Sequence, residues 1–168
     1  NMTTHIFGLR NQRGSCWINA TIQALLRIPD VQSRFTEDEA DSKIPVEMCL
    51  QELWSSKGDE GLHDFYECVR TTHMPAGQGI GDSHELLEHL CDKIPFLDKL
   101  MRFKVANRVT CSNSACSYTD ITHDTLIEFS ISPSDRKQTI THAILEAVKP
   151  YTVSDWTCDA CKHKGCSK

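Results

Sequence analysis

The chain has 168 residues, of which 39% are hydrophobic and 24% charged, a balance that is ordinary for a soluble globular protein. Its formal net charge of -5 argues against a broad nucleic-acid-binding surface, and no apolar run reaches the length needed to cross a bilayer. We therefore expect neither nucleic acid nor a membrane among its partners. The length allows one domain or one lobe of a larger protein.

Helical periodicity marks the start of the chain. The first predicted helix begins near Cys16 and ends before Pro29. Its apolar stripe has the spacing of one helix face and consists of Ile18, Ile22, Leu25 and Leu26. The acidic and polar stretch 36–43 that follows is predicted to be a linker.

Three further helices are predicted before residue 100. The second opens with Pro45 in its first turn, where proline is well tolerated, and a weaker third helix lies around residues 62–69. After a glycine-rich break at 76–81, Asp82 and Glu85 form an Asp-x-x-Glu arrangement typical of a helix N-terminus. The stripes that these helices should bury are Val46, Cys49, Leu50, Leu53 and Trp54, then Leu62, Phe65 and Val69, then Leu87, Leu90, Cys91 and Ile94.

The last third of the chain changes character. Residues 103–111 and 125–132 are predicted to form strands, the second because Ile127, Phe129 and Ile131 alternate with polar residues. One more helix is predicted just before Pro150. Its apolar positions are Ile140, Ala143, Ile144, Ala147 and Val148. The fold class is therefore α+β, with a helical part at 1–100 and a strand-rich part at 101–168.

The nine cysteines favour a metal site over a disulfide framework. Their number is odd, which argues against an extracellular disulfide scaffold and favours a reducing compartment, the cytoplasm or the nucleus. Cys111 and Cys116 are spaced C-x4-C, and Cys158 and Cys161 are spaced C-x2-C. Two such knuckles offer the four thiolates that a tetrahedral zinc ion needs. Two neighbouring residues remain alternative ligands: His163 and Cys166.

Cys16 stands alone at the predicted start of the first helix, after a loop of polar residues. Unpaired backbone N–H groups and the helix dipole at such a position favour a thiolate over a thiol. The same N–H groups, with the side-chain amide of Asn11, are suited to hold an oxyanion. A buried structural thiol is the competing interpretation, since many cysteines at helix ends have no catalytic role.

The segment "GLRNQRGSCWINATIQALL" resembles the cysteine box of the ubiquitin-specific proteases, the papain-like deubiquitinases. The family box reads Gly-Leu-x-Asn, a short glycine-containing link, Thr-Cys, an aromatic residue, Met, Asn and an apolar helix. The positions in register are Gly8, Leu9, Asn11, Cys16, Trp17, Asn19, Gln23 and Leu26. Ser15 and Ile18 stand where the family usually has threonine and methionine.

A second landmark and the order of the cysteine pairs extend the resemblance over nearly the whole chain. "GDSHELLEHLCD" is similar to the Gln-Asp-Ala-His-Glu-Phe helix start of the family through Asp82, His84 and Glu85. The resemblance implies a papain-like cysteine-protease fold, with a helical thumb at 1–100 that carries the cysteine box. Antiparallel, zinc-stapled fingers with the two cysteine pairs would follow at 101–168, and the palm would be incomplete.

The resemblance also implies the roles of individual residues. Cys16 would be the nucleophile of a thiol-dependent deubiquitinase that hydrolyses isopeptide bonds at the ubiquitin C-terminus, and Asn11 would donate to the oxyanion. Asp82 and Glu85 would contact the ubiquitin tail, or serve only as helix caps. The implied partner is ubiquitin or a ubiquitin-conjugated protein, and the implied cofactor is zinc.

Two departures from the family pattern leave a second function open. Arg13 stands where the family usually has glycine, in the loop that should form the oxyanion hole. None of the eight histidines is identified as the base that a papain-like site needs. A further segment or chain is expected to supply it. The alternative is a catalytically inactive module that binds ubiquitin or serves as a scaffold.

Overall fold

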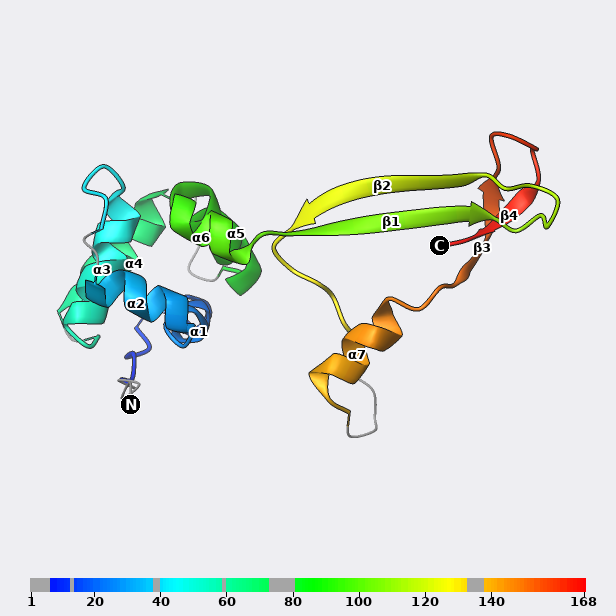
Figure 1. Ribbon diagram of the computed structural model, residues 1–168. Helices are drawn as coiled ribbons and strands as arrows, with labels where there is room; N and C mark the ends of the chain where they lie inside the picture. The colour runs from blue at the N-terminus through cyan, green and yellow to red at the C-terminus, as the bar shows by residue number, and fades with distance from the viewer. Residues whose placement is uncertain (1–6, 13, 38–39, 59, 73–80, 133–137) are drawn as a thin grey trace. The chain divides into compact units, whose positions relative to one another are not determined.

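The computed structural model describes residues 7–12, 14–37, 40–58, 60–72, 81–132 and 138–168 (Figure 1). The chain divides into two compact units, Asn1–Met101 and Arg102–Lys168, called below the N-terminal unit and the C-terminal unit. None of the described helices is both long and apolar enough to cross a membrane.

The N-terminal unit is helical throughout its described residues. The bounds of its helices are α1 Cys16–Leu25, α2 Pro29–Glu37, α3 Pro45–Ser55, α4 Gly61–Thr72, α5 Ser83–Lys93 and α6 Pro95–Met101. The four predicted helices are α1, α3, α4 and α5. The predicted linker at 36–43 was partly wrong, because α2 runs into it, and α6 was not predicted. Each of these two short helices opens with a proline. Proline ends the helix before it, and it also favours the first position of a new helix.

One continuous set of apolar side chains forms the core of the N-terminal unit. Its fully buried members include Ile18, Ile22, Val31, Leu50, Leu53, Phe65, Val69, Leu86, Leu90, Ile94 and Leu97. The stripe predicted for α5 was wrong at one position, since Leu86 is buried and Leu87 is only partly covered. The glycine-rich stretch 76–81 lies outside the described residues except for Gly81.

A buried ion pair ties three helices of this unit together. The Glu47 side chain on α3 is only 2% exposed, and its Oε1 accepts a hydrogen bond from Arg34 Nη2 on α2 at 3.0 Å. The Arg34 guanidinium also lies 5.9 Å from the ring centroid of Phe96 on α6. Burial of a carboxylate is tolerated because a cation and a hydrogen bond compensate its lost hydration.

Helices α3 and α4 pack side by side, and a glycine permits their close approach (Figure 1). Gly61 begins α4 directly against α3. A Cβ at this position would lie 2.5 Å from the backbone nitrogen of Leu53, closer than any side chain can come. The backbones of the two helices can therefore meet here only because residue 61 has no side chain.

The C-terminal unit is built on a four-stranded antiparallel sheet in the order β2-β1-β4-β3. The elements are β1 Phe103–Cys111, β2 Thr119–Leu126, α7 Ile140–Ala147, β3 Thr152–Thr157 and β4 Lys164–Ser167. Strands β1 and β2 form a long hairpin, from the pair Phe103↔Leu126 to the pair Thr110↔Thr119 (Figure 1). Strand β4 pairs with β1 only at its far end, through Thr110↔Ser167 and Cys111↔Cys166.

The second strand predicted from the sequence was misplaced. The strand lies at Thr119–Leu126, whereas the predicted stretch 125–132 is irregular beyond Leu126. Nearly every side chain of β2 is exposed, so the strand has no buried face and shows no alternation that a sequence pattern could reveal. The alternating residues Ile127, Phe129 and Ile131 instead follow the strand.

Helix α7 forms where the sequence predicted it, but its apolar residues are not covered. Ala143 is its only buried residue, while Ile140 is 74% exposed. Ile144, Leu145 and Val148 are exposed as well. A helix is usually stabilised by burial of such a face, so α7 presents an apolar surface for which the described residues provide no cover.

Candidate active site and metal centre

Cys16 is the first residue of α1, and its side chain is exposed. The alternative of a thiol sealed in the interior is therefore wrong. The residue before it, Ser15, is the N-cap of the helix and is only 2% exposed. The chain thus buries the residue that starts the helix and turns the thiol outward.

The loop before Cys16 is folded back on itself around the Ser15 hydroxyl. Gln12 N–H donates to Ser15 Oγ at 2.9 Å, and Ser15 N–H donates to the Gln12 carbonyl at 3.1 Å. Ser15 Oγ in turn donates to Asn11 Oδ1 at 3.3 Å. Since the amide oxygen of Asn11 faces this hydroxyl, the Nδ2 group is left as the donor that its side chain can offer a ligand. Arg13 lies outside the described residues.

Side chains of α1 and α4 hold the earlier part of the loop. Asn19 Nδ2 donates to the carbonyls of Leu9 and Arg10 at 3.4 and 3.3 Å, and one turn later Gln23 Nε2 donates to the Phe7 carbonyl at 2.8 Å. The Tyr66 hydroxyl on α4 lies 2.9 Å from the Arg10 carbonyl and is also hydrogen bonded to Asn19 Oδ1. Tyr66 was not singled out from the sequence, because nothing in the sequence shows that α4 reaches this loop.

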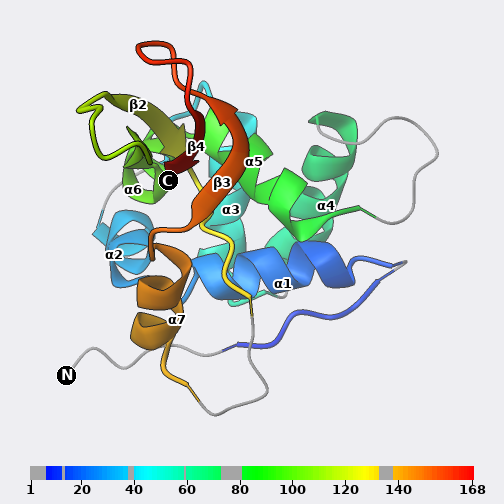
Figure 2. The same ribbon diagram turned by 90° about the vertical axis from the view of Figure 1, so that its right-hand side faces the viewer.

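The two motif-bearing helices are docked on each other, α5 against α1 (Figure 2). Thr21 Oγ1 donates to the Ser83 carbonyl at 3.1 Å, and Ser83 Oγ donates to the Trp17 carbonyl at 3.1 Å. Gly81 fits against the Trp17 indole, since a Cβ there would lie 2.8 Å from the ring. The start of α5 is thus fixed on the first turns of the helix that Cys16 begins.

Asp82 and Glu85 are both exposed at the start of α5. Asp82 is the N-cap, and its Oδ1 accepts a hydrogen bond from the His84 N–H at 2.6 Å. Its capping role is therefore visible in the structure. Both carboxylates remain accessible to a positively charged ligand.

No histidine in the described part of the chain is hydrogen bonded to Cys16. His84 lies 3.7 Å from Glu88, His142 lies 3.8 Å from Glu146, and His89 contacts Thr72 Oγ1 at 3.1 Å. His5 and His73 fall outside the described residues.

The C-terminal unit brings the two cysteine pairs together at the far end of its sheet. The Sγ atoms of Cys111, Cys116, Cys158 and Cys161 all lie within 4.8 Å of one another. Cys111 and Cys161 are 3.7 Å apart, and Cys116 and Cys158 are 3.9 Å apart. A tetrahedral site with Zn–S bonds of about 2.3 Å requires sulfur atoms about 3.8 Å apart, so these residues fit a zinc ion.

Neither of the two alternative ligands, Cys166 and His163, belongs to this cluster. Cys166 is buried opposite Cys111 in the β1–β4 ladder. His163 supports the knuckle through its backbone: its carbonyl accepts a hydrogen bond from the Cys158 N–H at 2.8 Å. The four sulfurs therefore come from the two knuckles.

The surroundings of the cluster act on its thiols in opposite directions. A hydrogen bond from the His163 backbone lowers the pKa of the Cys161 thiol to about 7. Burial raises the pKa of the Cys111 thiol to about 12. Asn113 Nδ2 also donates to Cys161 Sγ at 3.8 Å. Cys161 is thus the ligand most readily available as a thiolate, the form in which cysteine binds a metal.

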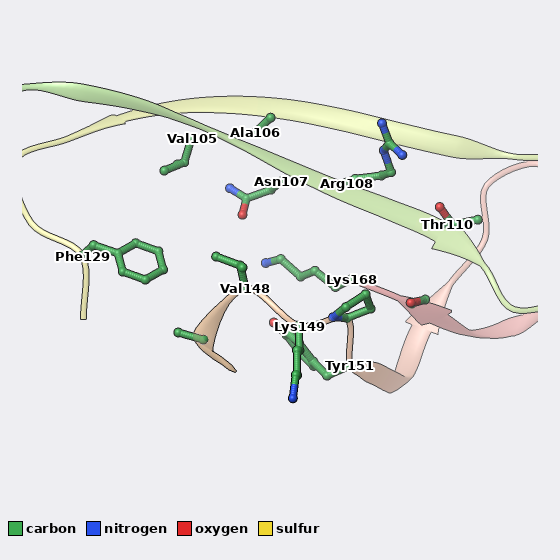
Figure 3. Close-up of a pocket in the computed structure, with 13 residues that line it drawn as sticks. Val105, Ala106, Asn107, Arg108, Thr110, Phe129, Val148, Lys149, Tyr151 and Lys168 are labelled. Carbon is green, nitrogen blue, oxygen red and sulfur yellow. The ribbon is translucent and has the colours of Figure 1, made fainter. Parts of the chain in front are cut away.

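A cavity of about 540 Å³ lies beside β1, within the C-terminal unit (Figure 3). Its walls come from β1, from the end of α7 and from the last residues of the chain. Val105 and Asn107 point to the side on which Phe129 and Val148 lie, whereas Arg108 points the other way (Figure 3). One wall of the cavity is therefore the face of β1 that carries Val105 and Asn107.

Comparison with known proteins rests on the fold. No family model matches the chain, and no curated protein matches it significantly. The structure is similar to a chain of the SAGA Ubp8/Sgf11/Sus1/Sgf73 DUB module bound to ubiquitin aldehyde, with a TM-score of 0.73 and 14% identity. That match covers 100% of this chain and 45% of the other.

A second similar structure is that of the Ubp8-Sgf11-Sgf73-Sus1 SAGA DUB module, with a TM-score of 0.67 and 13% identity over 93% of this chain and 42% of that one. The chain thus spans less than half the length of the chains it matches. At this identity the likeness establishes the fold. It confirms the fold predicted from the cysteine box: a helical thumb followed by antiparallel fingers of the ubiquitin-specific protease type.

Proposed function

We propose that the chain is the nucleophile-bearing part of a thiol-dependent deubiquitinase, which hydrolyses isopeptide bonds at the ubiquitin C-terminus. The observation that carries the proposal is the exposed thiol of Cys16 at the start of α1, after a loop in which the Ser15 hydroxyl orients the Asn11 amide. A buried N-cap and an exposed first residue suit a nucleophile better than a packing role.

The proposed reaction is acyl transfer through a thioester. The Cys16 sulfur attacks the carbonyl carbon of the ubiquitin C-terminal glycine, the lysine amine leaves with a proton, and water then hydrolyses the thioester. Asn11 Nδ2 and backbone N–H groups at the start of α1 would donate to the oxyanion. These donors are effective only if the loop keeps its shape. Hydrogen bonds from Asn19, Gln23 and Tyr66 to the loop carbonyls hold it in place.

The proposed partner is ubiquitin or a ubiquitin-conjugated protein. Asp82 and Glu85 are exposed at the start of a helix that Thr21 and Ser83 dock onto α1, so two carboxylates are held on the helix pair that carries the nucleophile. Such carboxylates would attract the arginine-bearing tail of ubiquitin. One of the similar modules is bound to ubiquitin aldehyde, which supports the choice of partner.

We further propose that the four cysteines of the C-terminal unit hold a structural zinc ion. Four thiolates close the coordination shell, so the ion would supply rigidity and take no part in hydrolysis. The unit has little core of its own, and the ion would hold the two knuckles at the end of the sheet. A protein that relies on these thiols belongs in a reducing compartment, the cytoplasm or the nucleus.

The base that activates Cys16 would come from a further segment or chain. Three features of the C-terminal unit support an additional contact: the exposed apolar residues of α7, the cavity beside β1, and the open edge of β1. In the described residues β4 pairs with β1 only at Thr110 and Cys111, so the edge from Lys104 to Val109 has no strand beside it on that side. An open edge of this length is normally covered.

A module that binds ubiquitin without cleaving it is the second candidate. The observation that favours it is that none of the described histidines is hydrogen bonded to Cys16. The exposed Cys16 and the oriented Asn11 argue against it, because binding alone needs neither.

A ubiquitin probe with a C-terminal thiol-reactive warhead tests these alternatives. The probe is incubated with the protein, with Cys16→Ala and, as a matched control, with Cys68→Ala, and adducts are located by peptide mass spectrometry. We expect an adduct on Cys16 that is lost only in Cys16→Ala. Saturable ubiquitin binding without an adduct would support the binding module. Absence of both binding and adduct would leave only a scaffold role.

A further inference from the structure

Two cysteines outside both candidate sites face each other across the contact between α3 and α4. Cys49 lies on α3 and Cys68 on α4, and both are partly buried. Their thiols are hydrogen bonded to each other. Neither residue belongs to the cysteine box or to the cysteine cluster of the C-terminal unit.

The packing of the two helices explains why the thiols meet. Gly61 lets the start of α4 come into contact with the backbone of α3 at Leu53. Cys49 on α3 and Cys68 on α4 lie on the facing sides of these two helices, where their thiols are in contact. A disulfide requires the two sulfur atoms to approach each other, and the hydrogen bond between the thiols shows that these sulfurs are neighbours.

The surroundings of Cys49 disfavour its thiolate form. Burial raises the pKa of the Cys49 thiol to about 11, and the neighbouring Cys68 contributes in the same direction, as do Asp64 and Glu52. The raised pKa makes Cys49 a poor first nucleophile, so its place in the reaction is to resolve an oxidised Cys68.

We propose that Cys49 and Cys68 are a site of reversible oxidation, where a peroxide converts the two thiols into a disulfide that links α3 to α4. The Cys68 thiolate attacks one oxygen of the peroxide, the O–O bond breaks, and a sulfenic acid and hydroxide form. The Cys49 thiol then attacks the sulfenic sulfur, its proton leaves with the hydroxyl group as water, and the S–S bond forms. Two electrons pass from the thiols to the peroxide. The proposal stands independently of the proposed function.

The link would act on the helix that supports the loop before Cys16. Tyr66, two residues before Cys68, makes the hydrogen bond to the Arg10 carbonyl. A covalent bond at Cys68 therefore restrains α4 next to this contact. It also removes conformations from the unfolded chain, so the oxidised protein should unfold at a higher temperature.

Peptide mapping tests the proposal, because trypsin separates the two cysteines. Cleavage after Lys43, Lys57 and Arg70 places Cys49 in peptide 44–57 and Cys68 in peptide 58–70, each as the sole cysteine. The full chain, carrying Cys16→Ser so that the exposed thiol does not compete, is supplied with zinc and treated with a small excess of hydrogen peroxide. Remaining thiols are alkylated before digestion.

We expect peptides 44–57 and 58–70 as a linked pair that lacks two hydrogens and that a phosphine reductant separates. The oxidised protein should melt about 5 °C or more above the reduced one. Cys49→Ser and Cys68→Ser should each abolish both effects, while Cys91→Ala, a buried cysteine on α5, should retain the link. Separate oxidation or alkylation of the two peptides, a link to other cysteines, or a lower melting temperature on oxidation would overturn the proposal.

Discussion

The two units of this chain are held together by different means. The N-terminal unit buries apolar side chains from all six of its described helices, with a buried ion pair among them. In the described part of the C-terminal unit the buried apolar residues are few, and three of the four are cysteines: Cys111, Ala143, Cys158 and Cys166. The first unit is thus stabilised by packing, whereas the second depends on its hairpin and on its sulfur cluster.

This difference assigns a separate physical task to each unit. The proposed nucleophile and oxyanion donor of the N-terminal unit would have to be held within a fraction of an ångström, and a packed helical core can do this without a cofactor. A long hairpin whose second strand is exposed on both faces, and whose first strand is only half-buried on one, cannot bury enough area to stay rigid. The zinc ion proposed for the cysteine cluster at the end of the sheet would substitute for the missing core. The two means of stabilisation can be separated by substitution and by removal of the metal.

The largest effect is expected from Arg34→Ala in the N-terminal unit. The substitution leaves the Glu47 carboxylate buried without its cation, which should lower the free energy of unfolding by about 3–5 kcal/mol. Urea denaturation followed by helix circular dichroism measures it. The double variant Arg34→Met, Glu47→Leu should recover most of the loss, and a double variant as unstable as Arg34→Ala would refute this explanation.

A somewhat smaller effect is expected from Cys158→Ser in the C-terminal unit. Removal of one of four thiolates should weaken zinc binding by on the order of 3 kcal/mol, a loss of more than about a hundredfold. Competition with a chromophoric chelator measures the affinity. Cys166→Ser is the matched control, because Cys166 is equally buried but lies outside the cluster. Equal losses in the two variants would show that the cluster is assigned wrongly.

Acidification should weaken zinc binding without loosening the N-terminal unit. The Cys161 thiol, whose pKa is lowered to about 7, is mostly ionised above that pH and takes up a proton as the pH falls through it. Binding must then displace this proton, so from about pH 8 to pH 6 Cys161 alone should reduce the affinity about tenfold. The same competition titration at several pH values provides the measurement. An affinity that is constant over this range would contradict thiolate ligation.

The smallest effect is expected from Tyr66→Phe. Loss of one hydroxyl hydrogen bond to the Arg10 carbonyl should cost about 1 kcal/mol of stability. It should also slow the reaction of Cys16 with the ubiquitin warhead, because the loop before Cys16 loses one of its supports. Tyr118→Phe in the C-terminal unit is the control. Equal warhead rates for Tyr66→Phe and the unchanged protein would show that the loop is held without Tyr66.

The sequence predicted the secondary structure of the N-terminal unit better than that of the C-terminal unit, because buried apolar side chains leave a periodic pattern and exposed strands do not. Helices α1, α3, α4 and α5 bury apolar stripes, and such stripes are visible as periodicity. Strand β2 buries nothing, so its position at Thr119–Leu126 was missed in favour of a more apolar stretch after it. Helix α6 has too few turns to show a period, and α2 has only two buried apolar residues, Val31 and Phe35.

Local spacing was sufficient to predict the cysteine cluster, but not the tertiary contacts around Cys16. The spacings of the cysteine pairs were sufficient to find the cluster, because ligands on one short turn must point together. The supporting contacts come from distant positions: Tyr66 on α4 contacts the loop before Cys16, and Ser83 on α5 contacts the first turns of α1. Contacts of this kind depend on tertiary packing, for which a single sequence contains no direct signal.

Hydrogen exchange of the backbone amides before and after zinc removal tests the central claim of this comparison most directly. After chelation we predict loss of protection at the end of β1 and in β3 and β4, with unchanged protection in α1, α3, α4 and α5. Equal loss in both units, or full protection of the cysteine knuckles without zinc, would contradict the account.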